Sequence, residues 1–231
     1  MSFVTIKNCR KAYVGKGTAA DPTIEFCLDE LTVEKEQQVA LVGPSGCGKT
    51  TLLNLISGIV APDAGEIQVG AARLDRLSGR AMDRFRGATI GYIFQGFNLI
   101  QPLNALQNML VALRFGRAVR GRERGARAVE MLDRVGLSHR LKHYPFELSM
   151  GEQQRLAIAR ALANKPPLIL ADEPTASLDA RNAAEVLTLL REVCPEGSHT
   201  LLIVTHDSNI AAQFPDQFDC SNLIREGKAA E

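Results

Sequence analysis

A glycine-rich loop between an apolar strand and a helix is the part of this sequence best suited to chemistry. The loop follows the phosphate-binding pattern Gly-x-x-x-x-Gly-Lys-Ser/Thr. It consists of Gly43, Pro44, Ser45, Gly46, Cys47, Gly48, Lys49, Thr50 and Thr51. Its backbone N–H groups and the positive end of the following helix would face phosphate oxygens. Lys49 would then reach the outer phosphates and Thr50 would place its hydroxyl on Mg²⁺, so the loop predicts a nucleotide site.

Two adjacent carboxylates form a second candidate site. Asp172 and Glu173 follow the apolar run 168–171, and a buried parallel strand delivers its carboxyl end to the ligand crevice. Asp172 is then placed to orient the Mg²⁺ shell, and Glu173 to orient or deprotonate a water. A capped strand-to-loop turn is the alternative. The phosphate-binding loop elsewhere in the chain favours the catalytic interpretation.

A third pattern, Leu-Ser-Met-Gly-Glu-Gln-Gln-Arg at residues 148–155, precedes an apolar helix. Ser149 is a typical N-cap, and Glu152 is its partner in a capping box. The same geometry creates an anion site at a helix N-terminus. Both interpretations can hold at once.

The elements that must position these residues alternate between strands and helices. We expect strands at 2–7, 24–28, 39–42, 65–70, 90–94, 168–171 and 200–205, and helices at 51–56, within 98–164 and at 182–193. Residues 1–94 are therefore predicted to be β-rich around one phosphate-binding helix. Strands alternating with helices indicate an α/β fold with a covered parallel sheet, into which the helical stretch is inserted.

The composition of the chain indicates which classes of partner it can bind and in which cellular compartment it works. The 231 residues carry a net charge of +1, so no nucleic acid partner is expected. The six arginines within 114–127 could meet nucleic acid or lipid, but the glycines among them favour a solvated face. The N-terminus has no signal-peptide core and no run reaches membrane-spanning length. We expect a soluble chain that reaches membranes through a partner. Five scattered cysteines without a Cys-x-x-Cys pair indicate a reducing cytoplasm.

Taken together, the motifs resemble the nucleotide-binding domain of an ABC transporter. In family order, the matches are the phosphate loop at 43–51, the Q-loop Gln95, the signature at 148–152, the Walker B carboxylates Asp172 and Glu173, the D-loop at 177–179 and the switch His206. Tyr13 lies where the family places an aromatic ring against adenine. Residues 94–100 and the end of the signature resemble a narrower group of lipoprotein-releasing, macrolide-exporting and cell-division ATPases.

The resemblance implies a fold and a site. The fold is a P-loop NTPase core with a parallel sheet, an N-terminal antiparallel β subdomain and an inserted α-helical subdomain. Residues 1–231 would form one domain, with the core at 1–95 and 165–231 and the helical subdomain at about 96–164. Glu173, His206 and Gln95 would be catalytic, and Thr50, Gln95 and Asp172 would hold Mg²⁺. The residues 43–51, Tyr13, Ser149, Gly151, Glu152 and Asp179 would contact ATP.

The resemblance also implies partners. Two copies would sandwich two Mg-ATP head to tail, each ATP lying between the phosphate loop of one copy and the signature of the other. This homodimer would power a separate integral-membrane permease from the cytoplasmic face of the cell membrane, with export or lipoprotein extraction as the expected transport. Met150 departs from the signature's usual glycine.

Three alternatives to a transport ATPase stay open. A non-transport ABC ATPase of DNA repair, translation or cell division usually carries a long coiled coil or tandem cassettes, and this sequence shows neither. A small-molecule kinase would have no use for the signature and the D-loop. A structural clamp that binds ATP without turnover would be separated from these by an ATPase assay.

Overall fold

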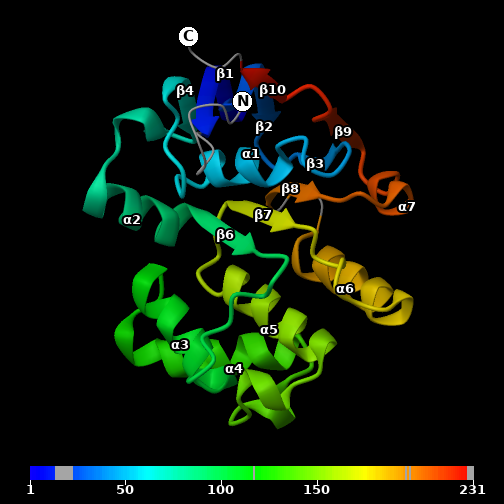
Figure 1. Ribbon diagram of the computed structural model, residues 1–231. Helices are drawn as coiled ribbons and strands as arrows, with labels where there is room; N and C mark the ends of the chain where they lie inside the picture. Colours follow the sequence, from blue (N-terminus) through cyan, green and yellow to red (C-terminus); the bar gives the residue numbers. More distant parts are fainter. Residues whose placement is uncertain (14–22, 117, 196, 198, 228–231) are drawn as a thin grey trace. The chain divides into compact units, whose positions relative to one another are not determined.

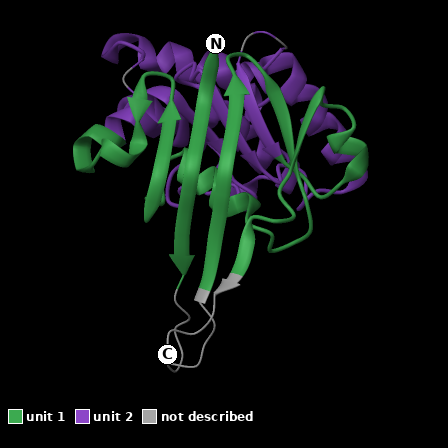
Figure 2. Cartoon of the chain, turned by 90° about the horizontal axis from the view of Figure 1, so that it is seen from above, with its two compact units in different colours: residues 1–82, 204–231 green, residues 83–203 purple. Residues whose placement is uncertain are grey.

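The computed structural model describes residues 1–13, 23–116, 118–195, 197 and 199–227. They belong to two compact units, residues 1–82 with 204–231 and residues 83–203 (Figure 2). Within the described ranges, no helix has the length and apolar character needed to cross a membrane.

The first unit contains an antiparallel sheet with the strand order β10-β2-β1-β4-β5. Its strands are β1 (Ser2–Tyr13), β2 (Thr23–Glu34), β4 (Ala64–Val69), β5 (Ala72–Arg73) and β10 (Ile224–Gly227). Val4 and Ile6 are fully buried and lie opposite Val69 and Ile67 of β4. They alternate with the half-buried Thr5 and the exposed Lys7, which explains why one face of the sheet forms a core. The expected strand at 2–7 is confirmed and extends to Tyr13.

The same unit holds the strand and helix that flank the glycine-rich loop. Strand β3 (Gln38–Val42) is parallel to β9 (Asp216–Asp219), and helix α1 (Lys49–Ile56) follows the loop. Leu52, Leu53, Leu55 and Ile56 of α1 are fully buried. Helix α7 (Ser208–Ala211) lies in the C-terminal part of the unit. The predicted strand–loop–helix order is confirmed.

Helix α2 (Gly79–Thr89) corrects the expectation of a single helix within residues 1–94. It follows a 3-10 turn, η1 (Leu74–Arg76). Phe85 is its only buried residue among those described, so no buried side chain recurs at helical spacing along it. The helix was therefore invisible to a pattern that depends on repeated burial.

The second unit contains parallel strands in the order β6-β7-β8, with the last residue of β8 beyond the unit's boundary. The strands are β6 (Ile90–Ile93), β7 (Leu168–Asp172) and β8 (Thr200–Val204). Leu168, Ile169, Leu170 and Ala171 are fully buried, as expected of a parallel strand covered on both faces.

Most helices of this unit come between β6 and β7 in the sequence. They are α3 (Ala105–Gly116), α4 (Arg124–Arg134) and α5 (Met150–Leu162), with the 3-10 turns η2 (Gly121–Glu123), η3 (Ser138–Arg140) and η4 (Pro145–Glu147); α6 (Ala180–Val193) follows β7. Helices α3, α4 and α5 pack on one another (Figure 1). The predicted α/β class with an antiparallel sheet and a helical insertion is therefore confirmed, while the subdomain limits near 96 and 164 stay a prediction.

Candidate functional site

The glycine-rich loop holds a buried lysine ammonium at its base. Lys49 is 6% exposed, and its Nζ donates to the carbonyl oxygens of Gly43 and Pro44, both at 2.7 Å. The sulfur of Cys47 lies 3.7 Å from the same nitrogen. The loop therefore curls around the Lys49 ammonium, and main-chain carbonyls at the start of the loop hold that ammonium in place.

Glycine is required at two positions of this loop by conformation and by space. Gly48 has φ of +104°, and a Cβ there would lie 3.1 Å from the Phe26 ring. Gly43 has φ of +146°, and its Cβ would lie 2.8 Å from the Cys47 sulfur. Other residues at these positions would combine backbone strain with a steric contact.

The donors of this loop fit a polyphosphate. Ser45, Gly46 and Thr50 are exposed around the tip, and a Cβ on Gly46 would meet nothing within 4 Å. Helix α1 begins after Gly48 without a side-chain cap, so anions can approach its N-terminal amides. A buried ammonium, uncapped amides and open space together suit the phosphates of ATP, and the Thr50 hydroxyl is an oxygen ligand of the class that Mg²⁺ prefers.

The two carboxylates lie at the carboxyl end of β7. Asp172 is the last residue of the strand and is 6% exposed. Burial raises the pKa of the neighbouring Tyr92, and the charge of Asp172 raises that pKa further. Tyr92 also stacks on Phe94, with ring centroids 4.0 Å apart. Asp172 is therefore a shielded carboxylate beside an aromatic wall.

Glu173 adopts a left-handed backbone conformation, with φ of +44°. That region is uncommon for residues other than glycine and asparagine, and such strain concentrates at functional positions. The Gln95 Nε2 lies 3.5 Å from Glu173 Oε2, at the limit of a hydrogen bond. The structure thus brings together two of the three residues predicted to be catalytic.

The third of them, His206, is exposed and follows β8 in the first unit. The preceding Thr205 donates its N–H to the Leu41 carbonyl at 3.4 Å, and its Oγ1 accepts from the Asp207 N–H at 3.1 Å. Leu41 belongs to β3, the strand that enters the glycine-rich loop. The histidine segment is therefore anchored beside that strand. Tyr13 ends β1 and is 38% exposed.

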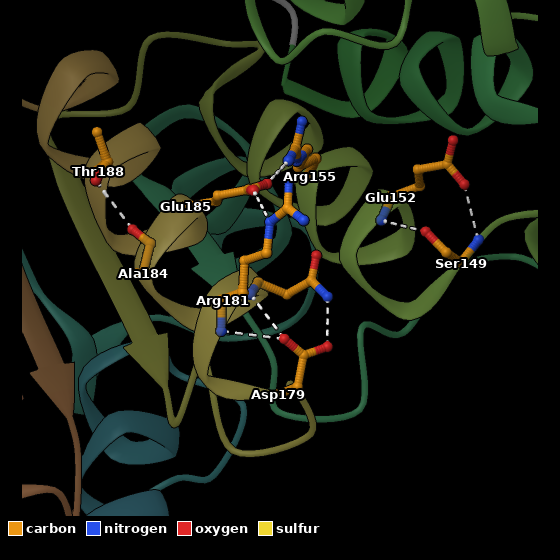
Figure 3. A network of polar contacts seen from close by, with 9 residues as sticks. Ser149, Glu152, Arg155, Asp179, Arg181, Ala184, Glu185 and Thr188 are labelled. Atoms are coloured by element: carbon orange, nitrogen blue, oxygen red, sulfur yellow. Dashed lines mark hydrogen bonds and ion pairs between the residues drawn. The ribbon is translucent and has the colours of Figure 1, made fainter.

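Ser149 and Glu152 form the predicted capping box at the start of α5 (Figure 3). Glu152 donates its N–H to Ser149 Oγ at 3.3 Å, and Ser149 donates its N–H to Glu152 Oε2 at 2.8 Å. Met150 is 52% exposed, so its side chain does not fill the turn. The substitution of the usual glycine is therefore accommodated.

Asp179 caps α6 with its own carboxylate, without a reciprocal capping box (Figure 3). Its Oδ1 accepts the N–H groups of Arg181 at 3.1 Å and Asn182 at 3.0 Å, and its Oδ2 accepts Asn182 Nδ2 at 2.5 Å. These bonds, led by the one from the Asn182 N–H, lower the pKa of Asp179. The carboxylate is therefore fixed in its charged form.

Comparisons with known proteins agree with this geometry. The family model described as ABC transporter matches residues 29–176. The lipoprotein-releasing system ATP-binding protein LolD of Pseudomonas fluorescens is 40% identical over 92% of this chain and 93% of its own length. The chain belongs to the ABC transporter family. It carries the ATP-binding cassette of that family, which is an ATPase domain.

Other relatives of this cassette are similar over different shares of their length. The uncharacterized ABC transporter ATP-binding protein Rv0073 of Mycobacterium tuberculosis is 43% identical over 91% of this chain, which spans 62% of that relative's length. Among solved structures, a dimeric post-hydrolysis state of the ATP-binding cassette MJ0796 bound to ADP and Pi is 36% identical, with a TM-score of 0.82 over 99% of both chains.

Two contacts of the cassette's signature were missed by sequence reasoning. A Cβ on Gly151 would lie 2.8 Å from Asn182 Oδ1, so the signature glycine packs against the residue that also binds Asp179. Arg140 Nε donates to Glu152 Oε1 at 2.8 Å. Neither contact has a sequence signal, because each joins segments that are brought together only by the packing of α5.

Helices α5 and α6 are further joined by an ion-pair cluster (Figure 3). Glu185 of α6 accepts a hydrogen bond from the Arg155 guanidinium of α5. Its other oxygen lies 3.3 Å from Arg181 Nε. The N-terminal halves of the signature helix and of the D-loop helix are therefore joined by the Arg155–Glu185 ion pair, and Arg181 holds the same carboxylate from within α6.

A groove of about 610 Å³ lies in the second unit of the cassette. Its walls include the aromatic or apolar side chains Tyr92, Phe94, Ile100 and Phe115, and the polar Asn98 and Arg160. Arg160 binds the carbonyls of Asn98 and Phe97. Phe115 is 74% exposed. The lining residues Phe94 and Asn98 stand on either side of Gln95 in the sequence, so the groove borders the Q-loop.

Proposed function

We propose that this chain binds and hydrolyses ATP to drive a separate integral-membrane permease. The observation that supports it best is the 3.5 Å approach of Gln95 Nε2 to Glu173 Oε2. This contact links Glu173, the carboxylate suited to act on water, to the segment after β6 that borders the groove. A partner in the groove can therefore influence the hydrolytic residue through one side chain.

Each predicted site residue has a role in this proposal. Lys49 and the amides of the loop bind the phosphates of ATP, and Tyr13 packs against adenine. Thr50, Asp172 and Gln95 are oxygen donors for Mg²⁺, which supplies charge neutralisation at the phosphates. Glu173 orients the attacking water and accepts its proton. His206 hydrogen-bonds to the γ-phosphate.

The second half of each ATP site comes from another copy of the chain. The N-terminus of α5 is formed by Ser149, Gly151 and Glu152. Asp179 is connected to it by Asn182, which donates a hydrogen bond to the Asp179 carboxylate. These groups have no role in the phosphate loop of their own chain under this proposal. They complete the site of the partner copy, so a head-to-tail homodimer closes on ATP and reopens after hydrolysis. The dimeric cassette MJ0796 supports this assembly.

The groove is the proposed docking site of the permease. Its aromatic walls and exposed Phe115 offer apolar area for a short cytoplasmic segment of a membrane protein. The chain would then work in the cytoplasm, on the inner face of the cell membrane. The similarity to LolD favours lipoprotein or lipid extraction as the transport process.

The test is copurification with a matched pair of variants. Tagged chain is bound to detergent-solubilised membranes of the source organism, and we expect an integral-membrane protein that coelutes and alters the ATPase rate. Phe115→Asp should abolish this coelution, because a charge replaces apolar groove area. Phe146→Asp is the control, since Phe146 is 75% exposed but does not line the groove. Equal behaviour of the two variants would contradict the proposed docking site.

A further inference from the structure

The signature of this chain carries a formal negative charge at the place where it is proposed to meet phosphate. Glu152 lies in the first turn of α5, and one of its oxygens accepts the Ser149 N–H at 2.8 Å. The serine Oγ in turn accepts the Glu152 N–H at 3.3 Å. The hydroxyl and the carboxylate are therefore parts of one small structure. An uncompensated charge there would repel a triphosphate.

Arg140 compensates that charge from outside the helix. Its Nε donates to Glu152 Oε1 at 2.8 Å, so both oxygens of the carboxylate are engaged. The arginine side chain is 34% exposed and that of Glu152 is 20% exposed. Such partly screened pairs interact more strongly than fully exposed ones.

The arginine is itself held in place. Its backbone N–H donates to the Leu137 carbonyl at 2.9 Å, its carbonyl accepts the His143 N–H at 2.9 Å, and its Nη1 lies 3.1 Å from His143 Nε2. His139 is a weaker neighbour, with Nε2 3.9 Å from Glu152 Oε1 and a side chain that is 65% exposed. Arg140 is therefore the only fixed cation that the described residues place on Glu152.

We propose that Arg140 is a positioning residue for the signature, which neutralises Glu152 and fixes it so that Ser149 can face the ATP of a second copy. The proposal rests on the proposed function, in which the signature completes the partner's site. Arg140 itself does not touch the nucleotide. Its contribution passes through the carboxylate to the serine hydroxyl and to the N-terminal amides of α5.

The pKa of Glu152 agrees with this arrangement. Burial raises it, but the hydrogen bonds from the Ser149 N–H and from Arg140 outweigh that effect and leave the pKa lowered. The carboxylate is therefore charged at neutral pH and needs its counter-ion. An amide at the same position would keep the capping bond without the charge.

The experiment is a double-mutant cycle on ATP-dependent dimerisation. All variants carry Glu173→Gln to slow hydrolysis, and the dimer fraction is measured by light scattering as ATP is titrated. Arg140→Gln should raise the ATP concentration for half-maximal dimer by about tenfold, or about 1.4 kcal/mol for each of the two composite sites. In a Glu152→Gln background the same change should cost less than about twofold. ATP binding to the single copy should not change.

Two controls separate charge from structure. Arg140→Lys keeps the cation and should stay within about threefold of the parent protein. Arg127→Gln loses an ion pair with Glu130 and a hydrogen bond to the Ala163 carbonyl near the other end of α5, and it should leave dimerisation as it is. The fold of each variant is checked by circular dichroism and thermal melting.

The outcomes are decisive in both directions. The proposal is overturned if Arg140→Gln dimerises like its parent, or if Glu152→Gln does not suppress the dimerisation defect of Arg140→Gln. It is also overturned if Arg140→Gln unfolds both with and without Glu152→Gln. These results would leave Arg140 with only a structural role or with none. Ser149→Arg measured in parallel distinguishes the underlying function. If Ser149→Arg still dimerises normally with ATP, the proposed function itself fails. If it does not dimerise while Arg140→Gln does, only the role of Arg140 is wrong.

Discussion

At the residue scale, the carboxylate that we propose as the base for hydrolysis is Glu173. It combines a left-handed backbone conformation with a contact to Gln95. A strained residue persists only where the surrounding structure holds it. In this chain the strain follows a fully buried strand, which can hold the backbone of the next residue in place.

Glu173→Gln is expected to bind ATP and to lose turnover. The amide keeps the shape of the side chain but cannot accept a proton from water, so kcat should fall by about 10²-fold or more. Turnover is measured by phosphate release and affinity by titration with a fluorescent nucleotide. Glu130→Gln is the control, since Glu130 is an exposed residue paired with Arg127. Turnover equal to wild type would show that Glu173 is not the base.

Lys49→Ala is expected to weaken ATP binding itself. The ammonium lies at the base of the loop between two carbonyls, and its loss removes a charge-assisted contact to ground-state phosphates. A loss of about tenfold or more in affinity corresponds to about 1.4 kcal/mol. Lys35→Ala, which removes an exposed pair with Glu36, should bind ATP like wild type. Unchanged affinity in folded Lys49→Ala protein would overturn the role of the lysine.

At the element scale, the site depends on where helices α5 and α6 begin. Both start at a capped residue, and Asn182 lies between the two starts. The signature glycine is therefore constrained by its own chain. A side chain at position 151 would meet Asn182, which also holds the Asp179 carboxylate.

Gly151→Ala should therefore weaken ATP-dependent dimerisation while ATP binding to the single copy stays intact. The new Cβ would lie 2.8 Å from Asn182 Oδ1, so the amide and the bond to Asp179 must shift. Gly125→Ala is the matched control, because a Cβ there would meet nothing within 4 Å and the residue lies in α4. That change should raise the free energy of unfolding by about 0.5–1 kcal/mol in urea titrations. Normal dimerisation of Gly151→Ala would contradict the packing argument.

Much of this arrangement was predictable from local sequence. The glycine loop, the apolar strand ending in Asp172, and the cap formed by Ser149 and Glu152 all follow from neighbouring residues. What the sequence could not predict depends on packing between distant segments or lacks periodicity. Arg140 and Asn182 reach the signature only in the folded unit, and α2 buries a single residue.

At the scale of the whole molecule, the account requires two copies for one complete ATP site. Every motif of the family is present in this chain, so a symmetric homodimer is sufficient. The phosphate loop and the signature would then act on the same nucleotide only when they come from different copies. This requirement separates the proposed function from a kinase and from any site formed within one chain.

The most direct test mixes two inactive proteins. Ser149→Arg places a bulky side chain in every signature, and Lys49→Ala damages every phosphate loop, so neither homodimer has a working site. In a mixed dimer both changes fall on one composite site and the other site is wild type. We predict that each protein alone is nearly inactive and that ATPase activity returns on mixing. Full activity of Ser149→Arg alone would contradict the account, because the signature would then be only a helix cap.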